Sequence, residues 1–483
     1  MSEVTAMNIV KKLYVLIAVS LLSVIVSGCM VGPEYHPPQP NAVPPEWAGA
    51  SKTVSEQPFS TATAPDLTKW WRQFNDPVLN ELVEEAIKTN FDLQIAVARL
   101  RQGRALIGIA SGGLWPSVTT SASSQLSHTA GTTSNNLERD LYKAGFDAVW
   151  ELDLFGGKRR SIESAEANVQ AAIENIRDVY VSLISEVALN YTQLRGFQQE
   201  IVIAQKNLKA QRHNAEITHK LLEAGFSSAL DAASADADVA STESQIPVLE
   251  TSVRQSIYTL SVLLGQPPAA LAERLFPSGS IPVMPNEISA GLPSELLRRR
   301  PDIRKCEAQL HAATAQIGVA VAQLFPSFSL TGSSYWNSNM LRTWWNYASS
   351  TFSVGPSVSW PIFQGGAIIS NVHLQEALRD EAFITYQKTV IAAFQDVENA
   401  LISFDNEQKR RKSLNDATIA NAKAVELSLQ LYTAGQINFL NVLIAERSLY
   451  FSEDALVQSE RNTTLDIIAL YKALGGGWES MVP

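Results

Sequence analysis

The sequence predicts a mainly α-helical protein of two similar halves, each with one strand hairpin and one long helical hairpin. Three observations support this fold: an internal repeat, heptad patterns too long for a compact core, and two alternating segments. The stretch "GIASGGLWPS" (108–117) returns 210 residues later as "GVAVAQLFPS" (318–327). The repeat is much longer than the period of a solenoid or a propeller. It therefore predicts an internal pseudo-twofold relation.

The N-terminus has the layout of a bacterial lipoprotein leader. Two lysines precede the apolar run 13–26, which ends in "VSGC", as in a secretory signal peptide. The small residues before Cys29 are similar to a lipobox, which implies cleavage after residue 28 and acylation of Cys29, and thus a lipid anchor. An ordinary signal with an incidental cysteine is the alternative. The start is either Met1 or Met7.

Strict alternation predicts two long strand hairpins. From 142 to 154 the even positions are apolar or small and most odd positions are polar, and 352–362 repeats this pattern. Such a period of two is typical of strands with two unlike faces. A partner segment precedes each strand, so we expect four strands per chain. At ~3.3 Å per residue each reaches ~40 Å, enough to cross a bilayer at a tilt.

The strands predict a transmembrane β-barrel that several chains share. The apolar face of the strands either contacts lipid or is buried inside a soluble sandwich. Because the leader directs the chain to the envelope, we favour contact with lipid. Trp150 and Trp360 then lie at one lipid interface, and Trp344 and Trp345 near the other. Four strands cannot close a barrel, and lipid does not tolerate open edges. Two copies would form a filled barrel, and three a channel.

Heptad patterns predict helices far longer than those of a compact domain. From Gly157 apolar residues recur every seven positions, and no proline occurs before Gly225. This span is ~100 Å long if it is helical. The second half has the same proline-free span up to Gly435. We expect both Gly225 and Gly435 at the far turns, because glycine accepts a positive φ.

These patterns divide the chain into six segments. In chain order we expect a lipoprotein signal peptide (1–28), an acylated, proline-rich extended strap (29–66), repeat 1 (67–275), a linker (276–294), repeat 2 (295–474) and a C-terminal tail (475–483). Repeat 1 contains a strand hairpin at 113–155 and a helical hairpin at 157–265. Repeat 2 contains the corresponding hairpins at 323–364 and 366–474.

Composition argues against several classes of function. With 38 Lys and Arg against 48 Asp and Glu, the net charge of −10 argues against a nucleic-acid partner. His213 and His219 would lie about 240° apart on a helix, so they do not form a metal site. No GxSxG or P-loop spacing occurs. We expect no catalytic residue, no metal, no enzymatic activity and no cofactor beyond the lipid on Cys29.

Several motifs of the mature chain carry a family resemblance. They are "VGPEY" (31–35), "WWRQFNDPVLNELVEEAIKTNFDL" (70–93), "WELDLFGG" (150–157), "LPSELLRRRPDI" (292–303), "SWPIFQGG" (359–366) and "YTAGQINFLNVLIAERSL" (432–449). Together they closely resemble the TolC-like outer-membrane factor family, nearest to its lipoprotein, NodT-type branch, which serves drug-efflux pumps.

The resemblance implies a fold, an assembly and a function. The fold is a long α-helical barrel in the periplasm joined to a β-barrel in the outer membrane, built as a homotrimer. The implied partners are a periplasmic adaptor (membrane fusion protein) and an inner-membrane pump of the RND or MFS type. The chain would be the exit duct of a tripartite efflux pump for drugs or other small toxic compounds. The alternatives are a duct for type I protein secretion and a non-conducting coiled-coil lipoprotein.

The resemblance also places a gated periplasmic tip at Gly225 and Gly435. Asp231 and Tyr432 fall where relatives hold the closed state with links between helices. For Asp231 a helix N-cap is the alternative, and for Tyr432 the alternative is plain packing.

Two positions in this tip depart from the family pattern. Relatives often carry aspartates six and nine residues after the second glycine, where this chain has Asn441 and Ile444. A cation-binding acidic ring is therefore in doubt here, unless Asp236 or Asp238 replaces it.

Overall fold

The computed structural model describes residues 30–38, 44, 47, 67–129, 137–283 and 293–481. Cys29, the signal peptide with its two candidate start residues, and most of the strap lie outside the described residues. Within the described ranges the chain is mainly helical with one four-stranded antiparallel sheet, which confirms the predicted fold class at that level.

The chain forms two compact units, and each unit takes segments from both repeats. Unit 1 comprises Met1–Gln39, Arg99–Ala172 and Lys305–Tyr386, and unit 2 comprises Pro40–Ala98, Ile173–Arg304 and Gln387–Pro483. The units cut across the repeats because long helices run from one unit into the other.

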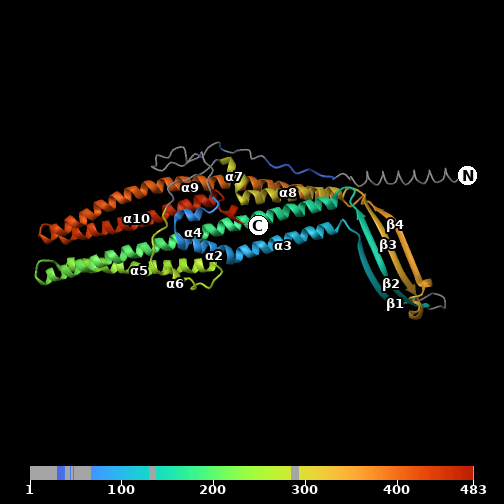
Figure 1. The fold of residues 1–483 in the computed structure, drawn as a ribbon, viewed down its shortest axis with the longest axis horizontal. Coiled ribbons are helices and arrows are strands. Elements are labelled where there is room, and N and C mark those ends of the chain that lie inside the picture. Colours follow the sequence, from blue (N-terminus) through green and yellow to red (C-terminus); the bar gives the residue numbers. More distant parts are fainter. Residues whose placement is uncertain are drawn as a thin grey trace. The chain divides into compact units, whose positions relative to one another are not determined.

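Unit 1 contains the sheet. Its strands are β1 (Ser117–Thr129), β2 (Leu137–Leu152), β3 (Ser327–Ser338) and β4 (Ser350–Ser359). They lie in the order β1-β2-β3-β4, and every neighbouring pair is antiparallel (Figure 1). The pairing of β2 with β3 joins the two repeats in one sheet, with Trp150 opposite Leu330 and Tyr142 opposite Ser338.

The helices form two long hairpins with shorter helices beside them. The first hairpin is α4 (Gly157–Glu223) with α5 (Ala229–Leu263), and the second is α9 (Ala367–Thr433) with α10 (Phe439–Ala473). The shorter elements are η2 (Trp70–Phe74), α2 (Pro77–Thr89), α3 (Phe91–Gly112), α6 (Ala272–Leu275), α7 (Pro293–Arg299), α8 (Pro301–Ala322), η3 (Leu341–Thr343), η4 (Tyr347–Ser349) and η5 (Trp478–Ser480). No described helix combines the length and the apolar character needed to cross a membrane.

The heptad positions of the long helices supply much of the core of unit 2. The members of this seam that are almost completely buried are Tyr180, Val187 and Leu194 in α4 and Val390, Val397 and Phe404 in α9. The apolar seam therefore packs helix against helix, as its period of seven predicts.

The motif at 70–93 builds a second part of that core. Trp70 stacks on Tyr471 with 5.1 Å between ring centroids, and both side chains are buried. Asp76 caps α2 by accepting hydrogen bonds from the backbone N–H groups of Val78 (2.9 Å) and Leu79 (3.0 Å). These residues of the motif therefore have structural roles.

Candidate functional site

Gly225 and Gly435 lie at the turns of the two helical hairpins in unit 2. Their φ angles are 80° and 73°, and an added Cβ would meet nothing within 4 Å at either position. Gly225 N–H donates to Leu222 O at 3.0 Å, and Gly435 N–H donates to Tyr432 O at 2.9 Å. Both glycines occupy turns that need a positive φ. Their assignment to a gated tip stays a prediction.

Asp231 belongs to a capping box at the start of α5. The N-cap is Ser228, whose Oγ accepts from Asp231 N–H at 3.1 Å, while Asp231 Oδ2 accepts from Ser228 N–H at 3.1 Å. The hydroxyl of Ser228 is the main hydrogen-bond donor that lowers the pKa of Asp231. The alternative of Asp231 as the N-cap itself is therefore wrong by three residues. Its hydrogen bonds stay within its own turn, on Ser227 and Ser228.

Tyr432 packs into an apolar cluster between α4, α5, α9 and α10. Its ring lies 5.3 Å from that of Phe439, beside a cluster completed by Ala215, Ala235, Val442 and Leu443. Its buried hydroxyl has no hydrogen-bond partner among the described residues. The structure does not bring Tyr432 and Asp231 together in a hydrogen bond, and Tyr432 has the packing role that was the alternative.

The two residues that replace the expected aspartates lie in the first turns of α10. Asn441 is exposed, and its side chain donates to Asn438 O at 3.4 Å. Ile444 is 56% exposed. Asp238 does not offer a free acid nearby, because it is buried and its Oδ1 accepts from Arg447 Nε at 2.6 Å.

The four tryptophans predicted for the membrane interfaces lie toward opposite ends of the sheet. Trp150 Nε1 donates to Leu114 O at 2.9 Å, and Trp360 Nε1 donates to Leu324 O at 3.0 Å. This bond is repeated in both halves of the chain. At the other end of the strands, Trp344 and Trp345 lie with 5.0 Å between their ring centroids. Their contact with lipid stays a prediction.

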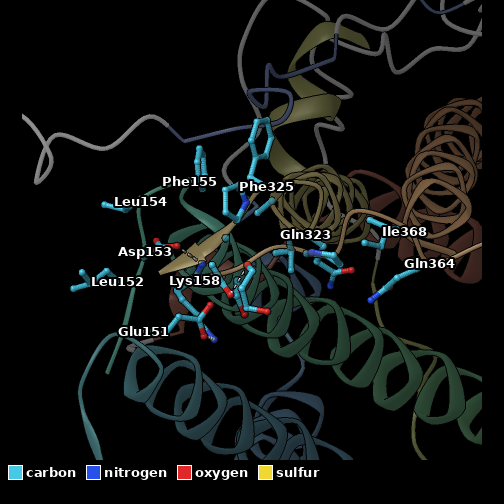
Figure 2. Close-up of a pocket in the computed structure, with 18 residues that line it drawn as sticks. Glu151, Leu152, Asp153, Leu154, Phe155, Lys158, Gln323, Phe325, Gln364 and Ile368 are labelled. Atoms are coloured by element: carbon cyan, nitrogen blue, oxygen red, sulfur yellow. Dashed lines mark hydrogen bonds and ion pairs between the residues drawn. The ribbon is translucent and has the colours of Figure 1, made fainter. Parts of the chain in front are cut away.

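A cavity of ≈ 580 Å³ in unit 1 lies where the strands meet the helices (Figure 2). Phe155 and Phe325 stack there with 4.6 Å between ring centroids. Lys158 forms an ion pair with Glu151 at 3.0 Å, and Asp153 accepts from the backbone N–H of Lys158 at 2.9 Å. Asp153 is paired in turn with Arg159 Nε at 3.1 Å, so each of these charges has a partner within the protein and the cavity offers no unpaired cation to an anion.

The described residues contain no group of three or more His, Cys, Asp or Glu placed to hold a metal ion. The expectation that the protein lacks a cofactor and a catalytic group stays a prediction. Two features were not predicted from the sequence: a buried pair of Glu446 with Asn214 in unit 2, and a surface of unit 1, which we call the groove, where Phe155, Arg160, His311 and Gly318 contact residues 31–35. The motif "VGPEY" was the available signal for the groove.

The sequence model described as outer membrane efflux protein matches the chain twice, at residues 82–266 and 292–476. The chain is 36% identical over 432 residues to the pyoverdine export outer membrane protein OpmQ of Pseudomonas aeruginosa, covering 86% of this chain and 89% of that protein. It is 30% identical over 469 residues to the antibiotic efflux pump outer membrane protein ArpC of Pseudomonas putida, covering 96% of each.

Among solved structures, the outer-membrane channel OprN has a similar fold. The TM-score is 0.86 at 36% sequence identity, over 93% of this chain and 100% of that chain. None of these three proteins is named as an enzyme.

Proposed function

Because the chain belongs to the outer membrane efflux protein family, we propose that three copies form the exit duct of a tripartite pump. The protein is an efflux channel of the outer membrane. Its proposed partners are a periplasmic adaptor and an inner-membrane pump of the RND or MFS type. Small toxic compounds, drugs among them, are the proposed cargo, and the names of OpmQ and ArpC support small molecules over a polypeptide.

The observation that carries the trimer is the open sheet of unit 1. In the described sheet, β1 pairs only with β2 and β4 pairs only with β3. Two edges of unpaired backbone groups are not tolerated in lipid. If β4 of each copy pairs with β1 of the next, three copies close a twelve-stranded barrel wide enough for a channel.

Exposed apolar side chains on the helices of unit 1 support the same head-to-tail contact. Ile109 on α3 is 73% exposed, and Ile384 on α9 is 62% exposed. Apolar patches of this kind mark surfaces that a partner covers, and a heterologous contact that closes makes a ring.

The sequence before the described residues supports a lipid anchor. The lipobox-like "VSGC" makes Cys29 the proposed site of acylation, which would hold the chain on the periplasmic leaflet of the outer membrane. The gate at the turns of Gly225 and Gly435 belongs to the same proposal.

Native mass spectrometry and planar-bilayer recording of the detergent-extracted protein test the duct. We expect a mass of three chains and stepwise single-channel conductance. Ile109→Asp should reduce the trimer fraction, whereas Leu230→Asp, which changes a 75% exposed side chain near the first helix turn, should leave it unchanged. A monomeric wild type, or a trimer that does not conduct even with the tip substitution Asp231→Ala, would overturn the proposal. Loss of a secreted polypeptide on gene deletion, without dye accumulation, would exclude the small-molecule cargo.

A further inference from the structure

Residues 31–35 lie in a groove of unit 1 between the start of α4 and the body of α8. Val31 N–H donates to Phe155 O at 3.1 Å, and Arg160 Nε donates to Val31 O at 3.2 Å. Both backbone polar groups of Val31 are thus bonded to the fold. Arg160 is itself buried, with 4% of its side chain exposed. The segment is therefore attached by specific bonds and is not merely laid on the surface.

A glycine of the segment, Gly32, faces a glycine of α8, Gly318. Gly32 has a φ of +90°, and a Cβ added to it would lie 2.5 Å from Gly318 Cα. A Cβ added to Gly318 would lie 2.7 Å from Arg160 Cγ. Side chains do not fit at such distances, and L-residues rarely adopt that φ. Close approach of Gly32 and Arg160 thus explains the glycine at position 318.

A linked set of side chains holds the other end of the segment. The ring of Tyr35 stacks on that of His311 at 4.2 Å between centroids. His311 Nε2 lies 3.0 Å from Glu163 Oε1, and Arg160 Nη1 donates to Glu163 Oε2 at 2.7 Å. Arg160 therefore contacts the segment at Val31 and supports Tyr35 through Glu163 and His311.

The counterpart positions of the duplicated half lack this set. Gly108, which is 210 residues before Gly318, has open space around an added Cβ. Arg101 replaces His311 at the same spacing. Ser370, 210 residues after Arg160, replaces the arginine: each N–H donates to the glycine carbonyl four residues earlier, and Ser370 is exposed. Both repeats contain the corresponding helices, but at the compared positions the residues that hold the segment occur on one side of the duplication and not on the other.

We propose that this groove is the binding site for residues 31–35 and that it sets where the N-terminus leaves the protein. Met30 Cα lies 2.8 Å from a Cβ built on Gly156, just after the end of β2. Met30 is thus held beside Gly156 at the strand–helix junction. The claim about the position of the lipid rests on the proposed acylation of Cys29. The claim that residues 31–35 bind the groove does not.

Hydrogen exchange of the full-length, detergent-solubilised protein tests the groove. We expect the peptide 30–38 to be protected in the wild type. Gly32→Ala and Tyr35→Ala should each speed its exchange at least tenfold, while exchange in the β-strands stays unchanged. Gly318→Ala should do the same, and its matched control Gly108→Ala should not. Unchanged protection of the peptide in Gly32→Ala and Tyr35→Ala would overturn the proposal. Equal loss of protection in Gly318→Ala and Gly108→Ala would also overturn it.

A second arm separates the groove from the lipid. In Cys29→Ser the acyl chains are absent, and we expect the peptide 30–38 to stay protected, because the contacts begin at Val31. Loss of protection in this variant would mean that the lipid and not the groove holds the segment, which overturns the proposal. If the wild type carries no acyl mass and its peptide 30–38 is still protected, the binding of residues 31–35 to the groove is supported and the acylation of Cys29 is refuted.

Discussion

The turn after α4 and the turn after α9 have the same backbone but different caps. Each has a glycine with positive φ and the same hydrogen bond from that glycine to the carbonyl three residues earlier. In the first turn Ser228 and Asp231 form a reciprocal capping box. Their counterparts 210 residues later are Asn438 and Asn441, and Asn438 makes no side-chain capping bond.

A second pair of counterparts near these turns differs more. Asp236 in α5 is exposed and lies 3.0 Å from His219 Nε2. Its counterpart Glu446 in α10 is buried and accepts a hydrogen bond from Asn214 in α4. Burial raises the pKa of Glu446 to about 7, with a smaller contribution from the negative charge of Asp238.

The difference shows that the return helix of repeat 2 is bound to repeat 1 by two polar pairs, in which Asn214, Glu446 and Asp238 are buried and Arg447 is exposed. Glu446 bonds to Asn214, and Arg447 bonds to Asp238. The duplication preserved what the backbone requires, a glycine with positive φ, and left the side chains to diverge. If this comparison is right, substitutions in α10 have larger effects than matched substitutions in the first hairpin.

We expect the largest effect from Arg447→Ala. Asp238 has 7% of its side chain exposed, and its Oδ2 already lacks a partner among the described residues. Removing the cation leaves a buried charge uncompensated, which we expect to destabilise unit 2 by about 2–3 kcal/mol, since Arg447 itself is partly exposed. Denaturant unfolding of the detergent-solubilised protein measures this free energy.

Arg212→Ala is the matched control within the first hairpin. Arg212 pairs with Glu243 at 3.0 Å, and both side chains are more than half exposed. Such surface pairs contribute little, so we expect a change within about 0.5 kcal/mol. Equal effects of the two variants would contradict the difference between the hairpins.

The second prediction concerns pH and Glu446. Its pKa is raised from the ordinary value of 4.5 to about 7 in the folded protein. Its contribution to stability is therefore present below about pH 4.5 and is lost as the pH rises through 7. We expect Glu446→Gln, which keeps the acceptor for Asn214, to be more stable than the wild type at pH 8 by about 1–2 kcal/mol and similar at pH 4.5.

Melting temperatures of both proteins across pH 4.5–8 measure this difference. Asp236→Asn is the repeat-matched control, and because Asp236 is exposed we expect its profile to follow the wild type. Parallel profiles for Glu446→Gln and the wild type would show that burial does not destabilise the charged form of the Glu446 carboxyl.

A feature of the fold or of the candidate site could be predicted from the sequence where residues close together in the chain determine it. The turns at Gly225 and Gly435 and the placement of Trp150 and Trp360 follow from repeat spacing and alternation. The sequence offered Asp231 as an N-cap only as the alternative to a link between helices, and the N-cap is Ser228, because Ser and Asp both cap helices and periodicity places a boundary only to within a few residues. The S-x-x-D spacing of a capping box was the signal that would have corrected it.

The paired buried groups were not predictable from one sequence. Asn214 and Glu446 are 232 residues apart, and Arg160 and Val31 are 129 apart. Asn214, Glu446 and Arg160 each have the character of a solvated helix position, and Val31 lies in a segment without regular structure. Their contacts depend on the order and rotation of packed helices, which periodicity does not specify.

The smallest predicted effect compares the two caps directly. Ser228→Ala removes the side-chain oxygen that accepts from Asp231 N–H and leaves Asp231 without its main donor, so we expect a loss of about 1 kcal/mol. Asn438→Ala removes no capping bond, and we expect a change too small to measure. Amide exchange in the first turns of α5 and α10 reports each loss locally. A larger effect at Asn438 than at Ser228 would mean that the caps diverged in the opposite sense, with the second turn the more dependent on its side chain.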